Sequence, residues 1–196
     1  MARRLLAKRQ RNQLISIVLT LLLAGAVWLG QRQGLIDKPA AKIPPPGTYT
    51  VSSFEDGDTI TVDMNGTPER VRMIGVDTPE TQDPRVPVQC YGKAASQFTK
   101  QLIGSSPVRL EADPTNTNRD RYNRLLRYVY LPDGRLVNAE IIRAGYGFAY
   151  TLFPFEKLEE FRGYESQARE QNLGLWGNCN INEQDQKKTT NPANPV

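Results

Sequence analysis

"GTYTVSSFEDGDTITVDMNGTPERVRMIGV", residues 47–76, contains three successive runs in which apolar and polar side chains alternate. Alternation with a period of two predicts β-strands that bury one face. The three runs are Thr48–Ser53, Thr59–Met64 and Glu69–Val76. The Asn-Gly pair in "MNGTP" is typical of the tight turn of a hairpin, so the last two runs are expected to be joined by such a turn.

The chain beyond residue 90 supplies the remaining elements of one domain. "CYGKAASQFTKQLI" places Ala94, Phe98 and Leu102 at helical spacing, and Gly104 is a suitable helix stop. "PVRLEA" and "RLLRYVYLP" predict two more strands. Asn138 is a good N-cap for a helix in "AEIIRAG", and "PFEKLEEFRGYESQARE" predicts an amphipathic helix.

The order of these elements is three strands, a helix, two strands and two helices. This order favours an α+β, mainly β fold: a five-stranded Greek-key barrel of the oligonucleotide/oligosaccharide-binding (OB) type, with about three packed helices. We place this domain at residues 48–180. Strand content alone would also suit another α+β domain.

The N-terminal residues 1–30 predict export. A basic head precedes Leu14–Gly30, seventeen residues without a charge, which as a helix span about 25 Å. The segment is either a cleaved signal peptide, with Ala24-Gly25-Ala26 as the cleavage site, or a retained anchor through residues 14–30. A buried soluble helix is the third interpretation, but the segment has no polar face. The basic flank places the N-terminus in the cytoplasm and the domain outside the membrane.

Two further segments are predicted to lack a core. Residues 31–47 are polar and end in "IPPPG", which suits a semi-rigid linker. Residues 181–196 are polar and rich in Pro and Asn, so we expect a disordered tail.

The formal net charge of +4 belongs to the N-terminus rather than to the domain. Residues 1–38 hold seven basic residues and one acidic residue, whereas the remaining 158 hold 18 basic and 20 acidic residues, a net −2. The overall charge therefore says little about a substrate.

The two cysteines and the absence of histidine restrict the chemistry. Cys90 and Cys179 are too few for a zinc site, and in an oxidising compartment a single disulfide is the natural pairing; two free buried thiols are the alternative. The chain has no histidine, which excludes Ser-His-Asp and Cys-His hydrolases and nucleases that use imidazole. A hydrolytic water must be activated by a carboxylate, a lysine or a metal.

Acidic residues flank two of the predicted strands. Asp58 precedes one strand, and Asp77 follows another in "GVDTPET", residues 75–81. Turn chemistry and a helix start at Thr78 would explain these residues without a function. In a barrel, however, the two aspartates can converge, and with the carbonyl of Thr78 they would form a site for a hard cation. Glu80 would then be a carboxylate free to activate water.

Two arginines complete a set suited to phosphodiester hydrolysis. Arg72 lies five residues before Asp77, and Arg124 precedes the strand that begins at Leu125. Each by itself is explained by a surface ion pair. Beside a metal site, however, planar guanidinium groups can hold the oxygens of a phosphate as charge develops.

The motifs of this chain resemble those of the thermonuclease (micrococcal or staphylococcal nuclease) family, from about Thr48 to Trp176. The matching segments, in order, are "DGDT" (56–59), "RMIGVDTPET" (72–81), "YGKAASQFTK" (91–100), "DRYNRLLRYVY" (120–130), "LVNAEIIRAGYGFAY" (136–150) and "NLGLW" (172–176). Each motif alone is weak, and their order and spacing make the match specific. Asn123 departs from the usual glycine, but asparagine tolerates the left-handed backbone.

This resemblance implies a calcium-dependent nuclease that cuts DNA and RNA with little sequence preference and leaves 3′-phosphate products. It assigns Ca²⁺ binding to Asp58, Asp77 and the Thr78 carbonyl, and a monomer is the family default. The catalytic residues that it implies are Arg72 and Arg124 on the phosphate and Glu80 as general base. Tyr122 and Tyr150 match tyrosines that contact the nucleotide, although packing would explain them too.

A non-catalytic module that binds single-stranded nucleic acid through the same barrel is the alternative. A degenerate copy of this kind should lack some of the five residues that the chemistry needs. All five are present: Asp58, Arg72, Asp77, Glu80 and Arg124. A calcium-stabilised envelope domain that does not contact nucleic acid is a third interpretation.

Overall fold

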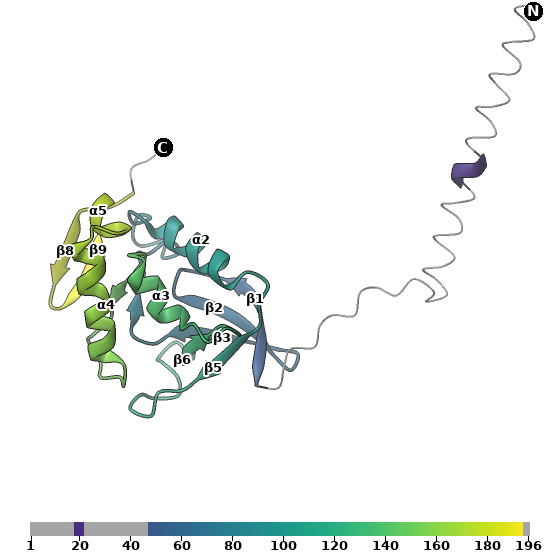
Figure 1. Cartoon of the computed structure of the whole chain (residues 1–196), viewed down its shortest axis with the longest axis horizontal. Coiled ribbons are helices and arrows are strands. Elements are labelled where there is room, and N and C mark those ends of the chain that lie inside the picture. The colour runs from purple at the N-terminus through teal and green to yellow at the C-terminus, as the bar shows by residue number, and fades with distance from the viewer. Residues whose placement is uncertain (1–17, 22–46, 194–196) are drawn as a thin grey trace, which may run out of the picture. The chain divides into compact units, whose positions relative to one another are not determined.

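The structure is a computed structural model that describes residues 18–21 and 47–193 (Figure 1). Residues 18–21 form a single helical turn, and no helix in the described part of the chain is long and apolar enough to cross a membrane. Apart from this turn and Gly47, the predicted signal segment and linker lie outside the described residues.

Five strands form a closed barrel in the order β1-β2-β3-β6-β5. They are β1 (Thr48–Phe54), β2 (Thr59–Met64), β3 (Thr67–Met73), β5 (Val108–Glu111) and β6 (Leu125–Tyr130). All neighbours in the barrel are antiparallel except β3 and β6, which are parallel, and pairing of β1 with β5 closes it. The predicted five-stranded OB-type barrel is therefore confirmed.

The alternation in the sequence produces the barrel interior. Inward-facing residues of β2 and β3, such as Ile60, Val62 and Val71, are fully buried, whereas Asp63 between them is exposed. Closing the sheet removes these apolar side chains from water, which stabilises the fold by about 25 cal/mol per Å² of buried apolar surface.

Residues 47–193 contain four helices outside the barrel, where about three were expected. They are α2 (Gly92–Ile103), α3 (Val137–Arg143), α4 (Leu158–Glu170) and the short α5 (Leu175–Asn178). Gly104 ends α2 as predicted, with φ +57°. In Figure 1, α2 and α3 lie next to the barrel strands, and α4 lies beyond α3.

Asn138 is not an N-cap, contrary to the prediction. The helix begins at Val137 with Leu136 as its N-cap, two residues earlier than predicted, and the Asn138 side chain is fully buried. Its Oδ1 accepts a hydrogen bond from the N–H of Val129, and its Nδ2 donates to the carbonyl of Ile74 at 2.9 Å. Asn138 therefore satisfies backbone groups of the barrel that its own helix covers.

The predicted third strand, Glu69–Val76, is divided in two. β3 ends at Met73, and the chain turns at Gly75, where φ is +72° and a Cβ atom would lie 2.6 Å from the Phe155 ring. The chain then resumes as β4 (Val76–Asp77), which pairs with β7 (Phe148–Ala149) outside the barrel. This turn places Asp77 at the end of the barrel instead of in its wall.

The predicted disordered tail is wrong for most of residues 181–196. The strands β8 (Ile181–Gln184) and β9 (Lys187–Thr190) form an antiparallel hairpin, which lies beside α4 and α5 in Figure 1. Cys90 and Cys179 form a disulfide next to it, as predicted. The hairpin could not be predicted from the low hydrophobicity of the tail, because it is held by polar contacts and the disulfide rather than by a hydrophobic core of its own.

Candidate active site

Asp58 lies immediately before β2 at the end of the barrel and is 5% exposed. Its Oδ2 accepts hydrogen bonds from the N–H and the hydroxyl of Thr78, at 2.8 and 3.0 Å. Its Oδ1 accepts a hydrogen bond from the Thr59 hydroxyl at 2.9 Å. These bonds fasten the β1–β2 turn to the segment after β4, so that two acidic regions far apart in the sequence meet.

Arg72 on β3 joins the two aspartates. Its Nη2 lies 2.8 Å from Asp77 Oδ1 and 3.3 Å from Asp58 Oδ2. Its Nη1 donates to the carbonyls of Met73 and Val76, at 3.0 and 2.6 Å. The guanidinium is therefore fixed at the turn around Gly75, and both carboxylates point to the same place.

The electrostatics of this cluster are dominated by burial. Burial raises the pKa of Asp77 to about 6; Arg72 opposes this shift, while the negative charges of Asp58 and Glu80 add to it. Burial likewise raises the pKa of Asp56 to about 6, although its hydrogen bond from the Thr81 hydroxyl acts in the other direction. A second positive charge here would relieve the repulsion among the acidic groups.

Glu80 lies at the start of the loop that links β4 to α2. Its Oε1 accepts three backbone N–H bonds, from Thr81, Gln82 and Asp83, at 2.9, 2.7 and 3.0 Å. Its own N–H donates to Oε1 of Gln89 at 2.9 Å. Among the described residues none donates a hydrogen bond to Oε2 of Glu80, which leaves this oxygen available for a water.

Arg124 is presented by a tight turn before β6. Asp120 accepts the N–H groups of Tyr122 and Arg124 on Oδ1, and its Oδ2 lies 2.7 Å from Nη2 of Arg124. Asn123 at this turn has φ +64°, the left-handed backbone expected from the sequence. Asp120 also helps Asp58 and Asp77 raise the pKa of Arg72 against the effect of burial, which links the turn to the aspartate cluster.

The two tyrosines differ in exposure. Tyr122 is 57% exposed, and the guanidinium carbons of Arg121 and Arg124 lie 4.8 and 5.4 Å from the centre of its ring. Tyr150 follows β7 and is partly buried. Burial raises the pKa of Tyr150 and Asp77 adds to the shift, whereas Arg72 lowers it, so Tyr150 borders the same cluster.

The structure thus brings some of the predicted site residues into direct contact and places the others around them. Asp58, Arg72, Asp77 and Thr78 are in direct contact. The charge of Glu80 acts on Asp77, Tyr150 borders the cluster, and Arg124 pairs with Asp120, whose charge acts on Arg72.

The donor atoms of the cluster fit a hard divalent cation. Within the described residues no three His, Cys, Asp or Glu side chains form a metal-binding group. The donors are all oxygen: the carboxylates of Asp58 and Asp77, which Arg72 joins, and the backbone carbonyl of Thr78 that the sequence predicts as a ligand. Such a set, completed by water, suits Ca²⁺ or Mg²⁺ rather than zinc or copper, which prefer nitrogen or sulfur.

Two residues at the site were not predicted. Lys187 on β9 is exposed, and its charge is close enough to Asp77 to lower the pKa of that carboxyl. Gln89 holds both backbone groups of Glu80, since its N–H donates to the Glu80 carbonyl at 2.9 Å. Neither residue belongs to one of the motifs. Lys187 lies on the hairpin that the sequence did not predict, and Gln89 pairs with Pro192 just after it.

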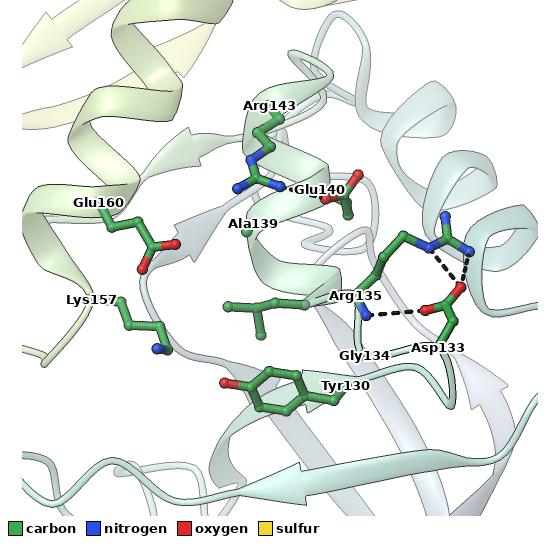
Figure 2. A pocket seen from close by; sticks show the side chains of 10 residues that line it. Tyr130, Asp133, Gly134, Arg135, Ala139, Glu140, Arg143, Lys157 and Glu160 are labelled. Atoms are coloured by element: carbon green, nitrogen blue, oxygen red, sulfur yellow. Dashed lines mark hydrogen bonds and ion pairs between the residues drawn. The ribbon is translucent and has the colours of Figure 1, made fainter.

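A cavity of about 460 Å³ lies elsewhere, between the β6–α3 turn and the start of α4 (Figure 2). Arg135 pairs with Asp133 and Arg143 with Glu140 at its rim. None of the predicted site residues lines this cavity. Four of its charged residues are held in these two ion pairs, and the predicted catalytic and metal-binding groups lie elsewhere.

Comparison with known proteins identifies a family and several relatives. The family model described as staphylococcal nuclease homologue matches residues 70–178. The thermonuclease of Staphylococcus intermedius is 42% identical over 130 residues, which are 66% of this chain and 76% of that protein. The thermonuclease of Staphylococcus hyicus is 42% identical over 132 residues, 67% of this chain and 76% of that protein. Endonuclease YncB of Bacillus subtilis is 42% identical over 129 residues, 65% of this chain and 60% of that protein.

Proposed function

This chain belongs to the staphylococcal nuclease family, and we propose that it is an exported, calcium-dependent nuclease that hydrolyses phosphodiester bonds in both DNA and RNA. Membership of this family makes it a nuclease-type hydrolase. The ion, the export and the products belong to the proposal. The observation that carries it is the convergence of Asp58 and Asp77 on the Nη2 of Arg72.

In this proposal Asp58, Asp77 and the carbonyl of Thr78 hold the calcium ion. The ion would offset the charge of the phosphate and orient it for attack. Asp58 is preorganised for the role, because the hydrogen bonds that it accepts from Thr59 and Thr78 fix the position of its carboxylate.

Glu80 is the general base. Its Oε1 is occupied by the three N–H groups of its loop, and Oε2 takes a proton from the attacking water. In-line attack on the phosphorus breaks the bond to the 5′-oxygen, so that the products carry a 3′-phosphate and a free 5′-hydroxyl.

Arg72 and Arg124 bind the non-bridging oxygens of the scissile phosphate. Planar guanidinium groups suit this because their paired N–H donors match the oxygens as negative charge grows. Arg124 lies on the side of the leaving 5′-oxygen. Tyr122 and Tyr150 contact the nucleotide from the rim of the site.

Export follows from the basic head and the apolar segment at residues 14–30, with the domain outside the membrane, anchored or released after cleavage. The disulfide between Cys90 and Cys179 supports an oxidising compartment. The proposed unit is a monomer.

The decisive experiment is a single-stranded DNA and RNA cleavage assay with calcium and with a chelator. Glu80→Gln should lower turnover about 10²- to 10⁴-fold without changing the circular dichroism spectrum, because it removes only the proton acceptor. Glu159→Gln, on the exposed first turn of α4, is the matched control and should cleave like the wild type.

Cleavage that continues in the chelator would refute the calcium site, and unchanged turnover in Glu80→Gln would remove Glu80 from its role. Binding of single strands without cleavage under any ion would favour the non-catalytic module.

A further inference from the structure

The C-terminal segment 179–193, here called the clamp, lies directly against the loop that carries Glu80. The N–H of Cys90 donates to the carbonyl of Asn191 at 2.7 Å, and the N–H of Ala193 donates to the carbonyl of Val88 at 2.8 Å. The Thr190 hydroxyl donates to the Cys90 carbonyl at 2.8 Å. The disulfide between Cys90 and Cys179 adds a covalent link between the two segments.

Gln89 transmits this contact to Glu80. It forms a β-bridge with Pro192 of the clamp, between the two backbone bonds at Val88 and Cys90. Gln89 also bonds to Glu80: its side-chain Oε1 accepts the Glu80 N–H, and its own N–H donates to the Glu80 carbonyl, each at 2.9 Å. Both backbone polar groups of Glu80 are thus held by one residue, which the clamp holds in turn.

The clamp is anchored independently of this loop. Nζ of Lys188 lies 3.0 Å from Oε2 of Glu165 on α4, and both side chains are only 13% exposed. Oε1 of Glu165 accepts the N–H of Ala149, the residue before Tyr150, at 3.0 Å. The clamp therefore joins a rigid helix and the β7 strand to the loop of Glu80.

The rest of the loop has few such supports. Residues 84–87 are exposed, and the ion pair between Arg85 and Asp83 lies at the surface. Exposed pairs contribute little to stability, about 0–1 kcal/mol. The segment around Glu80 is held by the Thr81 hydroxyl, which bonds to Asp56, and by Gln89, and of these two residues it is Gln89 that pairs with the clamp.

We propose that the clamp positions Glu80 for catalysis through Gln89, and that the Cys90–Cys179 disulfide makes turnover dependent on oxidation. This inference rests on the proposed role of Glu80 as general base. Reduction adds two electrons and two protons to the disulfide; a dithiol supplies them as it closes to its own disulfide. With the covalent link gone, the loop is held to the clamp only by hydrogen bonds, and the Glu80 carboxylate samples other positions.

A loss of position should appear in kcat rather than in substrate binding. Displacement of a catalytic group by about 1 Å costs about 10²-fold in rate. Arg72 and Arg124, which hold the phosphate, do not contact the clamp in the described structure. We therefore expect kcat to fall about 10- to 100-fold on reduction, while the affinity for a nucleoside 3′,5′-bisphosphate changes less than twofold.

The test compares the full-length chain in its oxidised and dithiothreitol-reduced forms with three variants. Cys90→Ala/Cys179→Ala should have the low kcat of the reduced wild type and should not respond to dithiothreitol. Gln89→Leu should be slow even when oxidised, because it loses the bond to the Glu80 N–H. Gln101→Leu, the same substitution at an exposed position on α2, is the matched control and should be unaffected.

All rates are measured at a temperature at which circular dichroism shows every variant folded, so that unfolding does not contribute. Hydrogen exchange supplies a readout that does not require activity. The amides of Thr81, Gln82 and Asp83, which bond to Glu80, should exchange faster after reduction. Exchange that is unchanged, or a folded reduced chain with the kcat of the oxidised one, would overturn the clamp proposal.

Failure of the proposed function gives a different result. An oxidised wild type that cleaves no nucleic acid with calcium would refute the nuclease assignment, and with it the dependence of turnover on the clamp. An oxidised wild type that cleaves normally, together with unaltered Cys90→Ala/Cys179→Ala, would leave the nuclease in place and refute the clamp alone.

Discussion

Gly92 sets the distance between helix α2 and the backbone of Glu80. A Cβ atom at this position would lie 2.7 Å from Cγ2 of Thr81, 3.0 Å from the Pro79 carbonyl oxygen and 3.1 Å from that of Glu80. The helix can therefore reach the catalytic loop only because its first residue has no side chain.

Gly92→Ala should move this loop and lower both stability and turnover. Overpacking of this kind costs about 1–3 kcal/mol, and the displaced Glu80 should lose rate as well. The checks are a denaturant melt and kcat on single-stranded DNA. Gly163→Ala on α4, where a Cβ meets nothing within 4 Å, is the control; it should stabilise by about 0.5–1 kcal/mol with normal kcat. Equal behaviour of the two variants would contradict the packing argument.

Asn123 is the second residue whose backbone shapes the site. Its φ of +64° lies in the left-handed region, which asparagine and glycine tolerate and alanine does not. Asn123→Ala should cost about 1 kcal/mol of folding free energy and should weaken phosphate binding by Arg124, the next residue. Asn123→Gly should leave both unchanged. Urea melts and bisphosphate titrations of the pair provide the measurement, and a stable Asn123→Ala would be the contrary result.

At the scale of elements, Asp113 joins the loop after β5 to β6 and to the approach to α4. Its Oδ1 accepts the N–H of Thr115 at 2.7 Å, and its Oδ2 accepts the Tyr128 hydroxyl at 2.5 Å and the Glu156 N–H at 2.8 Å. Burial by itself would raise the pKa of Asp113, but these hydrogen bonds outweigh it and lower the pKa to about 2.

This depressed pKa makes a part of the stability dependent on pH. The carboxylate contributes above its unfolded pKa, about 3.9, and its contribution is lost as pH falls through about 2. The difference between the pKa of Asp113 in the unfolded and in the folded chain corresponds to a contribution of about 2–3 kcal/mol to the free energy of unfolding. Asp113→Asn should lose this amount at pH 7 and little at pH 2, as urea melts at the two pH values would show. A variant equally destabilised at both would rule out the ionised form as the cause.

Some of the secondary-structure elements could be predicted from the sequence and others could not. The runs at Thr48–Ser53 and Thr59–Met64 matched β1 and β2 within one residue, because one face of each strand is more buried than the other and the alternation of apolar and polar residues follows that difference. Asn138 was misassigned, since an asparagine that caps a helix and one that bonds to a neighbouring strand look alike in sequence. The β8–β9 hairpin was missed because its stability comes from Glu165 and Cys90, far away in the chain.

At the scale of the whole molecule, a bound ion and the folded domain stabilise each other. Asp58 and Asp77 meet only when β2, β3 and β4 are assembled, so calcium should bind the folded chain and not the unfolded one. Calcium at one hundred times its Kd should raise the free energy of unfolding by about 2.7 kcal/mol, and excess chelator should remove this gain.

The measurement is a thermal melt of the wild type and of Asp77→Asn across a calcium titration. Asp77→Asn should lose most of the shift, whereas Asp133→Asn, an exposed acid at the β6–α3 turn, should keep it. If the melting temperature of the wild type does not change with the calcium concentration, the proposed ion is wrong.

The barrel strands, the residue types of the site and the left-handed turn at Asn123 could be predicted from the amino-acid sequence, since they depend on local alternation, chemistry and backbone preference. The division of a strand at Gly75, which brings Asp77 beside Asp58, and the pairing of the clamp with Gln89 next to Glu80 became visible only in the folded chain. Such contacts join segments as much as 100 residues apart. These contacts cannot be predicted from local sequence, because they arise from closure of the barrel and from a disulfide across the fold.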